Sequence, residues 1–110
     1  MQVTTTFNIE GHRITAYKGV VRGIIVRAPT ITQGIMGGLK SIIGGNIASY
    51  AEMCEQARQQ AYDAMLQQAR RLGANAIVGM QYDAASVEPQ GGAVEVLCYG
   101  TAVTVEALPA

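Results

Sequence analysis

Charged residues are scarce in this sequence, because Asp, Glu, Lys and Arg make up only 15% of its 110 residues, where about 25% is usual. The eight basic and eight acidic residues cancel to a formal net charge of zero. A protein that binds nucleic acid generally carries a basic face that replaces condensed counterions. Here the only adjacent basic pair is Arg70-Arg71, and the chain offers no Trp and a single Phe for stacking on bases. A nucleic-acid partner is therefore not expected.

Long hydrophobic runs and cysteine are also lacking. No stretch of about 18 apolar residues occurs, so the sequence predicts no transmembrane segment. The N-terminus lacks the basic start and apolar run of a signal peptide. Cys54 and Cys98 are the only cysteines, too few for a small secreted scaffold held by disulfides. We therefore expect a cytoplasmic protein.

Apolar residues, in contrast, account for 49% of the chain. This fraction excludes intrinsic disorder, which requires low hydrophobicity and high net charge. The length allows one hydrophobic core, so residues 1–110 are expected to form a single domain. Such a small domain buries only about two-thirds of its surface on folding, and with so few charges its remaining apolar surface needs a cover. Association with copies of the same chain is the simplest cover, so we predict a homo-oligomer.

The pattern of residues predicts an α+β fold in the order strand, strand, helix, strand, strand. β-branched and aromatic residues indicate four strands, over residues 1–8, 13–27, 76–87 and 93–105. Turn residues at Glu10-Gly11 and at Gly91-Gly92 predict two hairpins. We therefore expect a mainly antiparallel sheet packed on one long helix.

The helix is predicted over residues 47–72. Its apolar residues recur at intervals of three and four, at Ile47, Tyr50, Ala51, Cys54, Ala57, Ala61, Met65, Ala69 and Leu72. Asn46 is a suitable N-cap and Gly73 a suitable C′ residue. At 1.5 Å per residue the helix is roughly 39 Å long. Because this exceeds the width of so small a domain, we expect an overhanging end to contact a neighbouring subunit.

The strands are predicted to be apolar on both faces. In the second strand, simple alternation places Ile14, Ala16, Lys18, Val20, Arg22 and Ile24 on one side. Gly19 and Gly23 bracket its apolar run, and a glycine inside a strand marks a bulge or a close backbone approach. The last strand also alternates between two apolar sets, so both faces of the sheet need a cover. The helix can cover one face, and we expect a second copy of the chain to cover the other.

Residues 30–45 combine five glycines with an apolar stripe at helical spacing, formed by Ile35, Met36, Leu39, Ile42 and Ile43. The glycines make ordering costly, yet the stripe is too apolar for a free loop. We expect this segment to be mobile or to carry an interface, and to line any site that exists. Leu39 and Ile42 would then hold the assembly together.

Few residues suggest chemistry. His12 is the only histidine, beside a predicted turn, and is interpreted as a solvated turn residue because no catalytic or metal-binding partner adjoins it. Cys54 and Cys98 are interpreted first as small buried hydrophobes. They could also hold a soft metal together with Met53 or Met65. The helix start at Asn46, after the glycine-rich segment, offers free N–H groups to a small anion.

Four segments resemble the YbjQ-like family of small bacterial proteins: Gly19–Gly23, Gly37–Gly45, Leu72–Gly79 and Tyr99–Val103. The resemblance covers nearly the whole chain in the same order. It implies an α+β subunit with a fold akin to the dodecin subunit, which assembles into a ring, as a pentamer. The family has carried a heavy-metal-binding label and offers no catalytic motif to transfer.

Three hypotheses of function follow. The first is a non-enzymatic assembly or small-ligand-binding protein, favoured because the sequence shows no nucleophile–base pair. The second is a soft-metal binder that uses Cys54 or Cys98. The third is an enzyme or small-anion site at the glycine-rich segment and Asn46.

Overall fold

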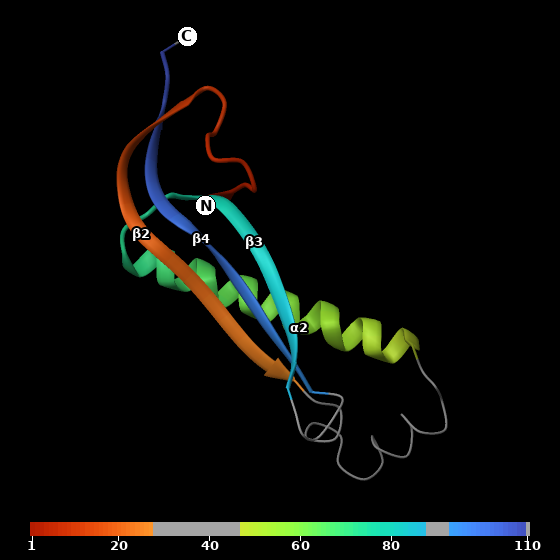
Figure 1. Ribbon diagram of the computed structural model, residues 1–110. Helices are drawn as coiled ribbons and strands as arrows, with labels where there is room; N and C mark the ends of the chain where they lie inside the picture. The colour runs from red at the N-terminus through yellow and green to blue at the C-terminus, as the bar shows by residue number, and fades with distance from the viewer. Residues whose placement is uncertain (28–46, 88–92, 110) are drawn as a thin grey trace.

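The computed structural model describes residues 1–27, 47–87 and 93–109. They form β1 (Gln2–Val3), β2 (His12–Arg27), α2 (Ile47–Arg71), β3 (Ala76–Val87) and β4 (Ala93–Ala107) (Figure 1). The predicted order of strands and helix is confirmed. The segment 30–45, Asn46 and the predicted turn Gly91-Gly92 lie outside the described residues, so the predictions made for them stay predictions.

The strands form one mixed sheet in the order β1-β3-β4-β2. β2 and β3 both run antiparallel to β4, whereas β1 runs parallel to β3. The mainly antiparallel sheet is thus confirmed, but the predicted N-terminal hairpin is wrong, because β1 and β2 lie at opposite edges. The turn between them does form, and the His12 N–H donates to the carbonyl of Ile9 at 3.1 Å.

β1 is much shorter than the strand predicted over residues 1–8. The backbone N–H of Thr6 donates to the hydroxyl of Thr4 at 3.2 Å, and the hydroxyl of Thr6 donates to the carbonyl of Asn8 at 2.6 Å. Hydrogen bonds of this kind offer the backbone an alternative to a strand ladder. Opposite this segment, β3 is interrupted by Gly79, which has a φ of 64° at a register shift.

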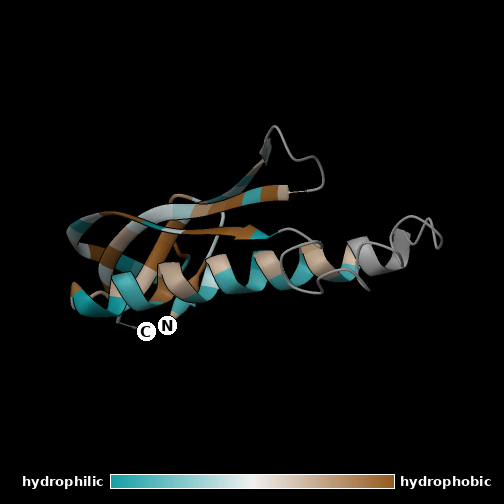
Figure 2. Cartoon of the chain, turned by 90° about the horizontal axis from the view of Figure 1, so that it is seen from below, coloured by the Kyte–Doolittle hydropathy of each residue, from teal (hydrophilic) through white to brown (hydrophobic). Residues whose placement is uncertain are grey.

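The long helix is confirmed, since α2 ends one residue before the predicted end. It packs on one face of the sheet, mainly against β2 and β4, and Figure 2 shows the two layers side by side. Its buried face consists of Ala57, Ala61, Met65 and Ala69, all fully buried. Small side chains bring the helix so close to β2 that a Cβ at Gly23 would overlap the carbonyl oxygen of Ala61. Of the two features predicted for a strand glycine, a bulge or a close approach, Gly23 shows the close approach.

The helix ends as predicted at Gly73, which has a φ of 79°. The N–H of Gly73 donates to the carbonyl of Arg70 at 3.0 Å, and the N–H of Ala74 donates to the carbonyl of Ala69 at 3.1 Å. This pair of hydrogen bonds is the Schellman motif. At the other end, no residue from 51 to 56 is buried, and the helix extends past the strands (Figure 1).

Two irregularities in β2 change which side its residues face. The pairing with β4 shifts between Ile14 and Ala16, and again between Tyr17 and Gly19. Each shift inserts one residue and inverts the alternation, and Gly19 takes a φ of 116° there. Of the two features predicted for a strand glycine, a bulge or a close approach, Gly19 shows the bulge. The assignment of Ile14, Ala16 and Lys18 to one side is wrong, because the sequence pattern does not reveal the inserted residues.

The sheet face that points away from α2 is called the outer face here. Near the N-terminus it is covered by residues 4–11, where Ile9 packs with Ala76, Val78 and Val103 in a small second core. The rest of the outer face, over the second halves of β2 and β3 and the first half of β4, is uncovered within the described residues.

Candidate interaction surface

The uncovered part of the outer face carries a set of apolar side chains, called the outer patch here. Its members are Val20, Ile24 and Val26 on β2, and Leu97 and Tyr99 on β4. The exposed fraction is 72% for Val20 and 55% for both Ile24 and Val26. Leu97 lies directly opposite Ile24 in the pairing of β2 with β4. Single exposed apolar residues are ordinary, whereas a contiguous set on one face indicates an interaction site.

Polar groups lie among and beside the residues of the outer patch. Arg22 lies on β2 opposite Tyr99, and Asp83 lies on β3 opposite Leu97. Glu95 lies on β4 between Val26 and Ala85. The only ion pair among the described residues joins Arg13 and Glu106, at the other end of β2. The charges beside the outer patch are therefore not paired with one another.

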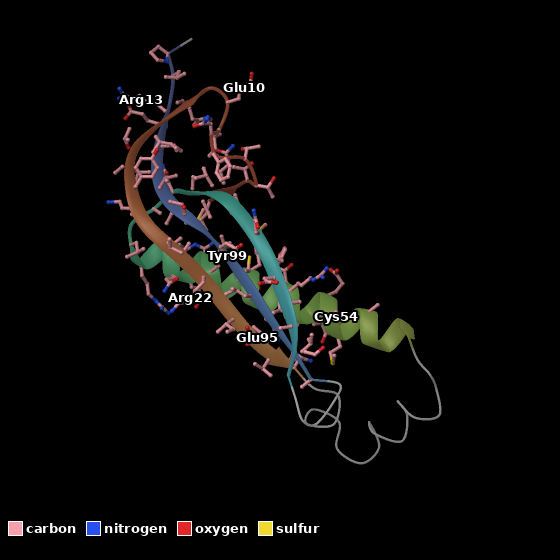
Figure 3. The ribbon with its side chains drawn as sticks, viewed as in Figure 1. Glu10, Arg13, Arg22, Cys54, Glu95 and Tyr99 are labelled. Carbon is pink, nitrogen blue, oxygen red and sulfur yellow. The ribbon has the colours of Figure 1, made fainter. Side chains whose placement is uncertain are left out.

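Tyr99 connects the outer patch to β3, because its hydroxyl donates to Oε1 of Gln81 at 3.2 Å. Figure 3 shows Arg22, Tyr99 and Glu95 along β2 and β4, whereas Cys54 lies on the part of α2 that extends past the sheet. This part of the outer face thus combines apolar with charged and polar side chains, and such a combination is typical of protein interfaces.

On the helix side of the sheet, Cys98 is fully buried and its Sγ lies 3.7 Å from Sδ of Met65. Burial raises the pKa of the Cys98 thiol to about 11, although a hydrogen bond from Tyr82 acts in the opposite direction. The thiol is therefore protonated and unreactive at neutral pH. The interpretation of Cys98 as a small buried hydrophobe fits this environment.

Cys54 does not join this sulfur pair. It is half-buried on α2, eleven residues before Met65, which corresponds to about 16 Å along the helix axis. Among the described residues, no three His, Cys, Asp or Glu side chains come together as a metal-binding group. The fold thus brings Cys98 and Met65 together but not the two cysteines.

His12 is the first residue of β2, directly after the turn, and its Nδ1 is 3.1 Å from the backbone carbonyl of Glu10. This contact fits a turn residue. Sequence reasoning missed the pair formed by Arg58 and Tyr82, whose guanidinium lies 5.9 Å from the centre of the ring. Desolvation raises the pKa of Tyr82, and the nearby Cys98 adds to the effect. The residues are 24 positions apart, so no local pattern could have linked them.

The segment from Leu72 to Gly79, which carries part of the family resemblance, has a structural role. Asn75 holds β4 through two hydrogen bonds, because its Nδ2 donates to the carbonyl of Val105 at 2.9 Å and its Oδ1 accepts the N–H of Val105 at 2.8 Å. Gly73 ends the helix and Gly79 forms the β3 irregularity. The segment therefore sets the path from helix to sheet and supplies no group for chemistry.

Of the helices that the structure describes, none has the length and apolar character needed to cross a membrane.

These features define a class of protein: a small α+β subunit with a mixed four-stranded sheet, one helix and an exposed apolar sheet face. Residues 1–106 match the model of the YbjQ family, whose description reads "Putative heavy-metal-binding". The chain belongs to this family, as the resemblance predicted.

Two relatives match over nearly their whole length, and their names describe no activity. A UPF0145 protein of Legionella pneumophila (strain Philadelphia 1) is 53% identical over 105 residues, covering 96% of this chain and 98% of the relative. A UPF0145 protein of Francisella tularensis (strain WY96-3418) is also 53% identical over 105 residues, covering 96% and 99%.

A solved structure shows the same fold. It is a protein of unknown function from Pediococcus pentosaceus, assigned to the DUF74 family, with a TM-score of 0.60 and 22% identity over 96% of this chain and 98% of that one. The likeness supports the α+β fold and does not extend to a ligand or an assembly.

Proposed function

We propose that the protein is a non-enzymatic subunit that assembles with copies of itself into a closed ring, using the outer patch as its interface. The observation that carries this proposal is the exposure of Val20, Ile24 and Val26 together on one sheet face. The pentamer implied by the family resemblance is the expected ring, and a cytoplasmic location remains the expectation from the sequence. A dodecin-like arrangement of the subunits is part of the same proposal.

The double variant Val20→Asp with Ile24→Asp tests the proposal. Both side chains are exposed within one subunit, so charges there leave the isolated fold intact. In an assembly the same charges would be buried without partners, which is costly. Light scattering should show a smaller species than the wild type, while circular dichroism shows the same helix content. Leu108→Asp, at a residue 51% exposed beyond the end of β4, is the matched control and should keep the full size.

The proposal is wrong if the wild type is a monomer at micromolar concentration. If the double variant keeps the size of the wild type, the outer patch is not the interface.

The buried contact between Cys98 and Met65 favours a second candidate function, soft-metal binding. A thiolate and a thioether are the ligands that select Cu(I), and the family description names heavy metals. A tetrahedral zinc site needs four ligands, and the described residues do not supply such a set. The sulfur pair therefore fits a soft ion held by few ligands, with Cys98 losing its proton on binding.

Titration with Cu(I) under anaerobic, reducing conditions tests this candidate. If Cys98 and Met65 hold the ion, native mass spectrometry shows one bound copper per subunit, and Cys98→Ala loses it while Cys54→Ala keeps it. Retention by Cys98→Ala would rule out this pair, and loss in Cys54→Ala alone would assign the ion to the helix end. The third hypothesis, a small-anion or enzymatic site at Asn46, concerns residues outside those described and stays a prediction.

A further inference from the structure

The two edges of the sheet are open at the same end of the molecule. β2 is an edge strand along its whole length. One of its outward N–H groups, that of Arg22, is satisfied by Oε1 of Gln68 on the helix at 2.7 Å. On the other edge, β1 and the residues after it bond to β3 only as far as Met80. From residue 81 to residue 87, β3 has no second neighbour among the described strands.

Open strand edges readily pair with another chain. Val26 on β2, Glu95 on β4 and Ala85 on β3 lie in one row across the sheet, so the open parts of both edges flank the outer patch. A neighbouring copy that approaches from either side would meet an open edge.

The charges beside the outer patch have opposite signs at its two flanks. The basic group is Arg22 on β2, and the acidic group at the other flank is Asp83 on β3. β4 lies between these two strands, and neighbouring strands are about 4.8 Å apart, so the two backbones are separated by roughly 10 Å across the sheet. One oxygen of Asp83 accepts the N–H of Ala84 at 2.9 Å, which orients the carboxylate.

We propose that the β2 flank of one copy lies against the β3 flank of the next, with the Arg22 guanidinium paired to the Asp83 carboxylate across the interface. This inference rests on the proposed function, because it specifies how the outer patch meets its neighbour. The contact is head-to-tail, since each subunit uses two different flanks. A head-to-tail contact closes into a ring when the rotation between subunits allows it. The occupant of this surface is thus a second copy of the same chain.

Charge reversal tests the pairing directly. Arg22→Asp places two carboxylates at each interface, and Asp83→Arg places two guanidinium groups there. Each single variant should raise the dissociation constant of the assembly by tenfold or more, measured by light scattering across a dilution series. The double variant Arg22→Asp with Asp83→Arg restores opposite charges at every interface and should recover the size of the wild type.

Arg13→Asp is the matched control, because it makes the same change of charge on the same strand. It breaks the ion pair between Arg13 and Glu106, in which the two side chains are 65% and 62% exposed. It should leave the assembly unchanged. Circular dichroism of all variants checks that the subunit is folded.

Several outcomes would overturn this inference. Single variants that keep the full size, or a double variant that stays dissociated, would show that Arg22 and Asp83 do not pair. A wild type that is a two-fold dimer would exclude the head-to-tail contact. If Val20→Asp with Ile24→Asp dissociates the assembly while the charge variants do not, the proposed function stands and only this pairing fails. A monomeric wild type would overturn both.

Discussion

The close contact between α2 and β2 predicts that Gly23→Ala is strongly destabilising. A methyl group at this position would overlap the carbonyl oxygen of Ala61 and would lie 2.8 Å from the backbone nitrogen of Met65. Both atoms belong to the helix backbone, so no side chain can rotate away. Gly23 is paired with Cys98 on β4, so the position of β2 is also set by its pairing with β4. The helix and the sheet would therefore have to separate.

The magnitude follows from the cost of overpacking, which is typically 1–3 kcal/mol when a core must shift. Because the obstacle is backbone, we expect a loss at the upper end of that range, about 3 kcal/mol in the free energy of unfolding. Gly11→Ala is the control for free space, since nothing lies within 4 Å of the Cβ position at Gly11. Unlike Gly23, Gly11 has a positive φ, 76°. The left-handed conformation alone should cost about 1 kcal/mol there.

Urea denaturation followed by circular dichroism measures both variants, at one protein concentration because assembly also contributes to stability. With an m-value of about 1.5 kcal/mol per molar urea, the midpoint for Gly23→Ala should fall by about 2 M. A Gly23→Ala midpoint no lower than that of Gly11→Ala would refute the account of how the helix packs on the sheet.

Three further predictions follow from the described contacts. Asn75→Ala removes both hydrogen bonds to Val105 and should lower the free energy of unfolding by about 2 kcal/mol, and an unchanged urea midpoint would contradict this role. Burial raises the pKa of the Cys98 thiol from its usual value of 9.0 to about 11. At a pH between these two values the thiol stays protonated in the folded protein but ionises in the unfolded chain. The free energy of unfolding should therefore fall as the pH rises through this range, by at most about 3 kcal/mol. For Cys98→Ala it should fall less over the same range. Finally, iodoacetamide should alkylate the half-buried Cys54 in the native protein and the buried Cys98 only after unfolding, as peptide mass spectrometry would show.

The helix and its contacts were predictable because their signals are local. The middle of the apolar stripe, from Ala57 to Ala69, marked the buried face of α2, and Gly73 marked the end of the helix. The stripe members Ala51 and Leu72 are exposed. A glycine inside a strand indicated either a bulge or a close approach, and the structure contains one of each, at Gly19 and Gly23. These residues are constrained by neighbours near in sequence or by backbone conformation. Both constraints limit which residue types can occupy a position, so the sequence reveals them.

The errors arose where pairing between distant segments decides the structure. Threonines 4 to 6 favour a strand by composition, yet the hydroxyl groups of Thr4 and Thr6 bond locally and β1 ends at Val3. That β1 joins β3 instead of β2 depends on contacts more than 70 residues apart. The inserted residues of β2 also leave the hydrophobic pattern nearly unchanged. Alternation therefore assigned Ala16 to the wrong face.

The outer patch was only partly foreseen. The two apolar faces of the last strand predicted that a second cover would be needed, but not that residues 4–11 supply part of it. The residues left exposed, Val20, Ile24 and Val26, could be identified only once the position of Ile9 was known. The opposite charges of Arg22 and Asp83 became meaningful for the same reason, because the strand order places them at opposite flanks.

Native mass spectrometry of the wild-type protein tests the central claim most directly. The account predicts one closed species whose mass is a whole multiple of 11.6 kDa, with about 58 kDa for the expected five-membered ring. It also predicts that Val20→Asp with Ile24→Asp shifts the signal to the mass of one subunit. A wild-type spectrum that shows only the 11.6 kDa subunit would contradict the account.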